Sequence, residues 1–136
     1  MNGTEHGEKP IQRIAAHILS MPLPELVELT RFGLAEHFGF HVSHLSRLFR
    51  RETGGTVLQF ITREKLRRAG QLLKSRQDLT IAEISCLLGW QKCEQFRRKF
   101  SRYYLLTPQQ FRRLVRVGQL WEHQAAENVL SRRNPV

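Results

Sequence analysis

The chain has 136 residues, which allows one domain or two very small ones, and its apolar share of 40% can fill a modest core. Lys and Arg number 22 against 12 Asp and Glu, so the formal net charge of +10 favours polyanionic partners, nucleic acid before an anionic membrane. No apolar run approaches the ~18 residues of a membrane span, no signal-peptide core is visible, and two cysteines can make neither a disulfide framework nor a four-ligand metal site. These features predict a cytoplasmic protein without a metal or cofactor.

The N-terminal part predicts a tail followed by a helix. Residues 1–10 are polar and contain glycine, as flexible tails do. Apolar residues keep helical spacing over residues 11–19 and predict a helix of about two to three turns. The proline-containing residues 21–24 interrupt it, and residues 25–29 fit either a short turn of helix or an ordered loop.

Two short helices that meet at Gly39 are predicted next. Leu34 and Phe38 keep helical spacing and lead to Gly39, where a residue without Cβ suits a tight turn out of a helix. Leu45 and Phe49 then form the apolar stripe of a second helix, whose opposite side is rich in serine and arginine. A helix that buries one face and offers an arginine-rich other face is what a helix-turn-helix needs to enter a DNA major groove.

A long helix without proline is predicted from Val57 to about Ser75, with apolar residues over roughly half of its surface. About 18 helical residues span ~27 Å, which is comparable to the ~34 Å of one turn of B-DNA. A rod of this length predicts that one chain can address two adjacent major-groove segments.

A second pair of short helices follows and pivots on Gly89. Thr80 and Glu83 have the spacing of a capping box, in which each side chain bonds an amide of the other residue. Phe96 and Phe100 form the buried stripe of the second helix of this pair.

The C-terminal part predicts one more helix. Thr107 and Pro108 read as an N-cap followed by proline at the first helical position. Apolar residues continue from Phe111, and those between residues 121 and 130 extend the prediction. The predicted organisation is a tail (1–10), a first helix-turn-helix subdomain (11–56), a linker helix (57–76), a second subdomain with an extended C-terminal helix (77–130) and a flexible tail (131–136).

The two pairs of helices are copies of one unit. Leu34 and Gly39 correspond to Ile84 and Gly89 at an offset of 50 residues. Beyond the turn the offset is 51, as Phe49 and Phe100 show, so the second turn contains one additional residue. Self-similarity of this kind indicates a duplicated supersecondary unit.

These motifs resemble the DNA-binding domain of the AraC/XylS family of bacterial transcription regulators. About 100 of the 136 residues are covered, and the motifs occur in the family's order. They are LAEHFGFHVSHLSRLFRRETG at residues 34–54, KLRRAGQLL at residues 65–73, and TIAEISCLLGW with FRRKFSRYYLLTPQQFRR within residues 80–113.

The resemblance implies an all-α fold of about seven helices, with two helix-turn-helix subdomains joined by a long central helix. It also implies promoter binding as a transcription regulator. The second helix of each subdomain would enter the major groove, and RNA polymerase would be a further partner. The family's companion effector domain is missing, which fits either an excised domain or a single-domain member.

Carried onto this chain, the resemblance places base reading on two sets of residues. They are Ser43, Ser46 and Arg47 in the first subdomain, and Lys92, Glu94, Gln95 and Arg98 in the second. Arg47 and Arg98 are the leading candidates, because a guanidinium pairs bidentately with guanine. Glu94 has two readings, acceptance from a cytosine amine and pairing with a neighbouring arginine. Phosphate contact is predicted for Arg50, Arg51, Arg97, Lys99, Arg102 and Arg112, for which a solvated surface charge is the alternative.

The chain departs from the family pattern at three places. Residues 20–29 lengthen the first connection, and the segment beyond Arg116 is longer than the motif requires. Leu105 stands where the second recognition helix usually ends on glycine. A leucine is strained in a left-handed cap, so we expect this helix to end differently.

Other residues carry weaker signals. His37, His41 and His44 have no carboxylate or thiol placed beside them to complete a metal site. Cys86 is expected to be a buried, inert small hydrophobic residue. Cys93 lies among cations near a predicted helix N-terminus, and a redox-sensitive thiol is the alternative interpretation of this residue.

An enzyme is disfavoured, because no base or orienting group accompanies Cys93. Binding of RNA, for example as a ribosome-associated protein, is the alternative that basic charge alone permits. The duplicated helix-turn-helix argues against it, because A-form RNA has a major groove too narrow for a helix.

Overall fold

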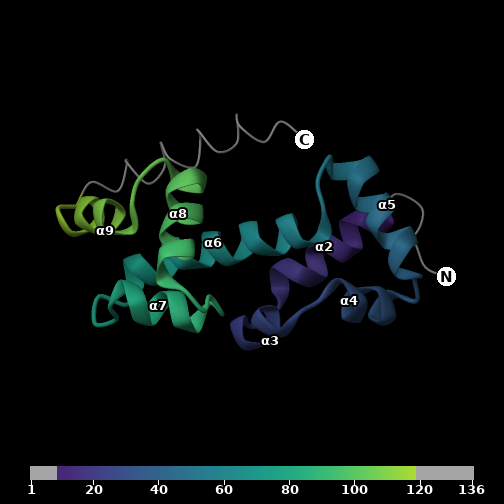
Figure 1. Ribbon diagram of the computed structural model, residues 1–136, viewed down its shortest axis with the longest axis horizontal. Coiled ribbons are helices and arrows are strands. Elements are labelled where there is room, and N and C mark those ends of the chain that lie inside the picture. Colours follow the sequence, from purple (N-terminus) through teal and green to yellow (C-terminus); the bar gives the residue numbers. More distant parts are fainter. Residues whose placement is uncertain (1–8, 119–136) are drawn as a thin grey trace. The chain divides into compact units, whose positions relative to one another are not determined.

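The computed structural model describes residues 9–118, and in this range all regular secondary structure is helical (Figure 1). Within these residues there are eight helices. The additional one, compared with the seven expected, is the short α3, which settles the segment left open between a helical turn and a loop. The helices are α2 (Pro10–Ser20), α3 (Leu23–Glu28), α4 (Arg31–Phe38), α5 (Val42–Thr53), α6 (Val57–Ser75), α7 (Ile81–Leu87), α8 (Cys93–Tyr104) and α9 (Pro108–Arg116).

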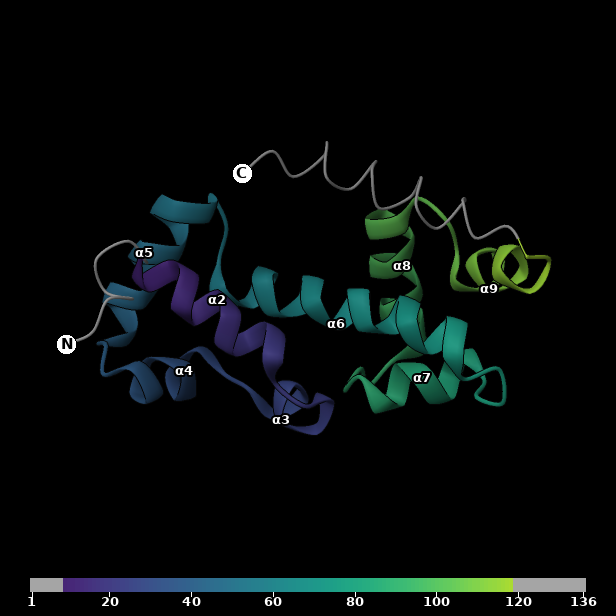
Figure 2. The ribbon, with the colours of Figure 1, turned by 180° about the vertical axis from the view of Figure 1, so that it is seen from behind.

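The described residues divide into two compact units. Unit 1 runs up to Glu64 and unit 2 begins at Lys65, so that α6 contributes residues to both. Figure 2 shows the same ribbon from behind, with α2 to α5 belonging to unit 1 and α7 to α9 to unit 2. Each unit therefore contains one copy of the duplicated helix pair.

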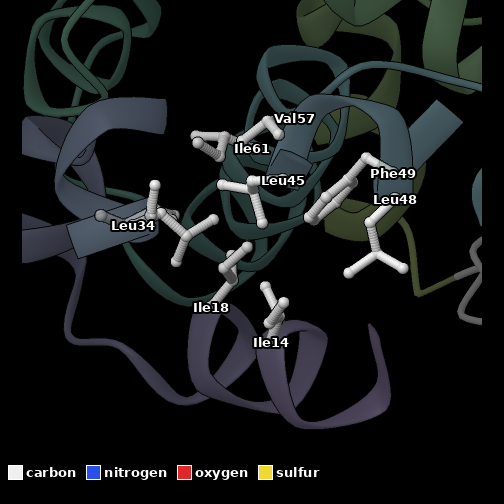
Figure 3. Close-up of a cluster of buried hydrophobic side chains, with 10 residues drawn as sticks. Ile14, Ile18, Leu34, Leu45, Leu48, Phe49, Val57 and Ile61 are labelled. Carbon is white, nitrogen blue, oxygen red and sulfur yellow. The ribbon is translucent and has the colours of Figure 1, made fainter. Parts of the chain in front are cut away.

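The core of unit 1 is assembled from five helices, and α3 contributes Leu26. Ile14 and Ile18 of α2 meet Leu34 of α4 and Leu45 and Phe49 of α5, and all five are fully buried (Figure 3). Val57 and Ile61, in the first turns of α6, close the cluster. Burial of each such side chain stabilises the fold by roughly 1.5–3 kcal/mol, so the apolar stripe of α5 fixes which face of this helix remains outside.

The core of unit 2 is largely aromatic. Phe96, Phe100 and Tyr104 lie on one face of α8, and Phe111 of α9 packs edge-on against Phe100 with ring centroids 5.7 Å apart. The hydroxyl of Tyr104 donates to the carbonyl of Leu66 in α6 at 3.1 Å. The stripe of α8 is thus anchored on both sides, and the opposite face of this helix is left to solvent.

The turn between α4 and α5 and the turn between α7 and α8 contain the same backbone hydrogen bond. The amide of Phe40 donates to the carbonyl of Ala35 at 2.8 Å, and the amide of Trp90 donates to that of Ser85 at 3.1 Å. Gly39 and Gly89 precede these residues with φ of 73° and 89°, a left-handed conformation that glycine adopts without strain. The predicted pivots are confirmed. The extra residue of the second copy lies between Gly89 and the start of α8, as the change in offset indicated.

The expectation about Leu105 was wrong. Leu105 adopts the left-handed cap conformation itself, with φ of 63° and ψ of 20°, and its amide donates to the carbonyl of Ser101 at 2.8 Å. Gly54 occupies the matching position after α5, with φ of 79°. The two copies therefore share the same helix end, although only the first carries glycine there.

The predicted caps are present. Thr80 and Glu83 form a capping box at α7, with an oxygen–nitrogen distance of 2.8 Å in one direction and 3.0 Å in the other. Thr107 caps α9 by accepting from the amide of Gln110 at 3.1 Å, and Pro108 is the first residue of that helix.

Two further predictions concern the C-terminal region. Helix α9 ends at Arg116, and Gly118 follows with φ of 80°. The predicted extension of this helix over residues 121–130 and the predicted tail at residues 131–136 lie outside the described residues. Of the predicted N-terminal tail only residues 9 and 10 are described, and Pro10 already belongs to α2. None of the helices described here combines the length and apolar character needed to cross a bilayer.

Candidate nucleic-acid interface

Helix α5 presents its predicted reading residues away from the core. Ser43 and Arg47 are exposed and Ser46 is half-buried, whereas Leu45 and Phe49 face inward. The N-terminus of the helix is capped by His41, whose Nδ1 accepts from the amide of Ser43 at 3.3 Å. The ring also contacts the Ser43 hydroxyl at 2.9 Å, so this cap orients one of the predicted reading side chains.

Helix α8 presents the second predicted set in the same way. Lys92 and Gln95 are exposed, and so are Glu94 and Arg98, whose side chains are 85% and 65% accessible. A carboxylate oxygen of Glu94 lies 3.8 Å from Arg98 Nη2, one helical turn away. Pairing with arginine, one of the two readings of Glu94, thus occurs in the structure. Such an exposed pair contributes only about 0.3–0.5 kcal/mol, so DNA can displace it at small cost.

The residues predicted to meet phosphates are not equivalent. Arg50, Arg51, Lys99 and Arg102 are exposed, and Arg97 is half-buried. Arg112 is only 8% accessible, and its Nη2 donates to the carbonyl of Arg76 at 3.0 Å.

Unit 1 has a groove beside its recognition helix, with a volume of about 490 Å³. It lies between the start of α4, the outer face of α5 and the start of α6. We call it groove 1, and its lining residues are Arg31, Ser46, Arg47, Arg50, Thr56, Val57 and Leu58. Three of these are arginines, so a predicted base-reading residue and a predicted phosphate contact share one cationic surface.

Unit 2 has a groove at the corresponding place, with a volume of about 670 Å³. It lies between the start of α7, the side of α8 and α9. We call it groove 2, and its lining residues are Thr80, Ile81, Ala82, Arg97, Gln109, Arg112, Arg113 and Arg116. Four are arginines and none is acidic.

Two of the arginines of groove 2 are held in place by the connection between α6 and α7. Besides the bond from Arg112, Nε of Arg116 donates to the side-chain oxygen of Gln77 at 2.8 Å. Nε of Arg112 is buried and has no hydrogen-bond partner. Burial and the nearby Arg116 lower the pKa of Arg112, whereas Asp78 acts in the opposite direction.

Asp78, the acidic residue near groove 2, is paired with Arg76. Asp78 accepts two hydrogen bonds from the guanidinium of Arg76, at 2.9 and 2.7 Å. These bonds hold the pKa of Asp78 at about 2, so the carboxylate is charged at neutral pH.

Sequence reasoning missed several of these residues. Arg31, Arg113 and Arg116 were not singled out, although the spacing of Arg112 and Arg116 by one helical turn indicated a shared face. It also missed a pair of histidines in unit 1. The rings of His17 and His37 stack with centroids 4.2 Å apart, and the pKa of His17 is lowered by burial and by His37.

The expectation for Cys86 was wrong, whereas Cys93 lies at a helix N-terminus as predicted. Cys86 is exposed and not buried, because Ile81, Ile84 and Ser85 form the buried side of α7. Cys93 is half-buried at the first position of α8. No group of three or more potential metal ligands occurs in the part of the chain that the structure describes.

Comparison with known proteins identifies the domain type. A family model described as a helix-turn-helix domain matches residues 34–114. The chain is 33% identical over 122 residues to YfiF, a helix-turn-helix-type transcriptional regulator of Bacillus subtilis, with 82% of this chain and 38% of YfiF covered. It is 37% identical over 71 residues to the regulatory protein YesN of the same organism, covering 52% of this chain and 19% of YesN. The chain thus spans less than two fifths of the length of these relatives.

A solved structure shares the fold. It is a transcriptional regulator from Chromobacterium violaceum with an AraC-type DNA-binding domain, and it matches with a TM-score of 0.69 and 23% identity over 77% of this chain and 94% of the solved one. The comparisons give no support to the alternative of an RNA-binding protein, because the relatives are transcriptional regulators.

Proposed function

The chain belongs to the AraC/XylS family of transcription regulators, and from this premise we propose that it binds double-stranded DNA sequence-specifically through α5 and α8. In this proposal each of the two helices enters one segment of the major groove. Regulation then follows from contact with RNA polymerase, or its exclusion, at the bound promoter.

One observation carries the proposal. Arg47 and Arg98 occupy the same position in the two copies, and each is exposed on the helix face opposite a buried apolar stripe. Burial of the apolar stripe fixes the rotation of each helix about its own axis, and this rotation directs the guanidinium outward. A guanidinium in a major groove can donate two hydrogen bonds to guanine O6 and N7, which gives about 1–3 kcal/mol of discrimination.

The remaining residues divide by what they can contact. Ser43, Ser46, Lys92, Glu94 and Gln95 flank the two arginines and are proposed to adjust base preference. The exposed cations are proposed to bind phosphates and to set the register on the duplex; they are Arg50, Arg51, Lys99 and Arg102, together with the half-buried Arg97. Arg112 is left out of this group, because its guanidinium is buried and bonded to the carbonyl of Arg76.

The length of α6 supports reading of two adjacent segments. The helix has 19 residues, which corresponds to about 28 Å at 1.5 Å per residue. Recognition elements one turn apart on B-DNA require ~34 Å. We therefore propose one asymmetric site in which α5 and α8 read different ends.

The test is selection of bound duplexes from a random pool, followed by affinity measurements on the selected site. Arg47→Ala and Arg98→Ala should each weaken binding by about 1–3 kcal/mol and relax base preference at different ends of the site. Arg13→Ala, which removes an exposed arginine of α2, is the matched control and should change neither. Equal losses on selected and random DNA would show that the two residues contact only phosphates.

A further inference from the structure

Groove 2 contains four arginines, one more than groove 1. At the offset of 51 residues, Arg112 and Arg113 of groove 2 correspond to Ile61 and Thr62 in unit 1. Neither of those residues lines groove 1, and Ile61 is part of the apolar core. Groove 1 has Arg31 and Arg50 instead, which correspond to Ile81 and Ser101 in unit 2, so different residues supply the positive charge of the two grooves.

The arginines of groove 2 have no acidic partner in the part of the chain that the structure describes. Among residues 9–118, no carboxylate forms an ion pair with any of the four arginines of the groove. Asp78 is bound to Arg76 instead. Burying a guanidinium such as that of Arg112 is unfavourable unless an anion or hydrogen-bond acceptor compensates for lost hydration.

The geometry suits a ligand that carries phosphate. Arg112 and Arg116 are fixed by their bonds to Arg76 and Gln77, so part of the site is ordered before a ligand arrives. Planar guanidiniums bind phosphate oxygens in pairs of parallel hydrogen bonds, and several together match a group with two negative charges. A volume of about 670 Å³ lies within the usual range for small-molecule sites, ~300–1,000 Å³.

We propose that groove 2 binds the phosphate group of a small phosphorylated molecule, with Arg97, Arg113 and Arg116 as its ligands and the buried Arg112 as a fixed positive charge beside them. Because Arg97 belongs to α8, the helix that also carries Arg98, an occupied groove changes the charge beside the second recognition helix. The bound anion therefore lowers the affinity of unit 2 for DNA by adding negative charge at this surface.

The experiment titrates the whole chain with inorganic pyrophosphate, in the absence of DNA and with sodium chloride adjusted to constant ionic strength. Binding is followed by calorimetry and by the NMR signals of the arginine Nε–H groups. We expect saturable binding with a shift of the Arg112 signal. Arg113→Gln, at an exposed position, should weaken it about tenfold or more, as loss of a charge-assisted hydrogen bond predicts. Arg13→Gln removes the same charge in unit 1 and should change it less than about twofold.

A second arm distinguishes the two sources of phosphate. Duplexes of the selected site with single methylphosphonate substitutions show whether Arg113 instead contacts the DNA backbone. Dependence on one backbone phosphate without any saturable binding of pyrophosphate would overturn the proposal, and so would equal effects of Arg113→Gln and Arg13→Gln. Because pyrophosphate binding is measured without DNA, its outcome is separate from that of the DNA-binding proposal.

Discussion

Gly70 of α6 lies against Tyr104 of α8, and replacing it by alanine tests the packing of unit 2. A Cβ added at Gly70 would lie 2.4 Å from the hydroxyl oxygen of Tyr104 and 3.0 Å from its Cζ. The hydroxyl cannot simply move aside, because it donates to the carbonyl of Leu66 and Tyr104 is only 3% accessible. Any relief requires the aromatic ring, and with it the stripe of α8, to shift.

The magnitude follows from opposing effects. Alanine within a helix is favoured over glycine by about 1 kcal/mol. Forcing an extra methyl group into a packed core costs about 1–3 kcal/mol, and losing the hydrogen bond of Tyr104 costs about 1 kcal/mol more. The free energy of unfolding of Gly70→Ala should therefore decrease by about 1–3 kcal/mol. Tyr104→Phe alone should decrease it by about 1 kcal/mol.

The assay is chemical unfolding followed by circular dichroism, applied to both single variants and to the double variant. Removal of the hydroxyl relieves the closest contact, so the loss in the double variant should be smaller than the sum of the single losses by ~1 kcal/mol or more. Gly33→Ala in α4 is the matched control, because its Cβ would meet nothing closer than Thr30 Oγ1 at 3.5 Å. It should not destabilise the protein. Stabilisation by Gly70→Ala, or strict additivity in the double variant, would refute this account of the packing.

Leu105→Gly should raise the melting temperature, because a φ of 63° costs a leucine about 1–2 kcal/mol and the side chain, which is 55% exposed, contributes little packing. An unchanged or lower melting temperature in a thermal scan would contradict strain at this cap. The lowered pKa of His17 means that, below its ordinary value of 6.5, the unfolded chain binds more protons than the folded one. The contribution of His17 to the free energy of unfolding should thus be constant above this pH, decrease as the pH falls from this value to the lowered pKa, and level off below it. Unfolding curves at several pH values should show a shallower decrease in His37→Gln, which lacks one cause of the shift, and an equal slope would oppose the assignment. Finally, mass spectrometry after treatment of the native protein with iodoacetamide should find Cys86 alkylated before Cys93, the reverse order being inconsistent with the exposure of α7.

The sequence by itself determined the order of the elements and the duplication. Helical periodicity located the buried stripe of each recognition helix, and this stripe dictates the outward face. The glycines at 39 and 89 and the Thr80 cap located the helix ends, because left-handed turns and N-terminal amides require particular residue types. Local chemistry of this kind needs no knowledge of distant contacts, so it can be predicted directly.

Only the tertiary structure decided what depends on neighbours distant in sequence. Leu105 adopts a conformation that its own preference opposes, because the aromatic stripe of α8 and the start of α9 constrain the chain on both sides. Arg112 was predicted to contact phosphate, with a solvated surface charge as the alternative, yet it is buried against the carbonyl of Arg76, which is 36 positions away. The gathering of four arginines in groove 2 has the same origin. Side chains from α8 and α9 and from the turn before α7 converge there, and no local pattern reports how separate helices pack together.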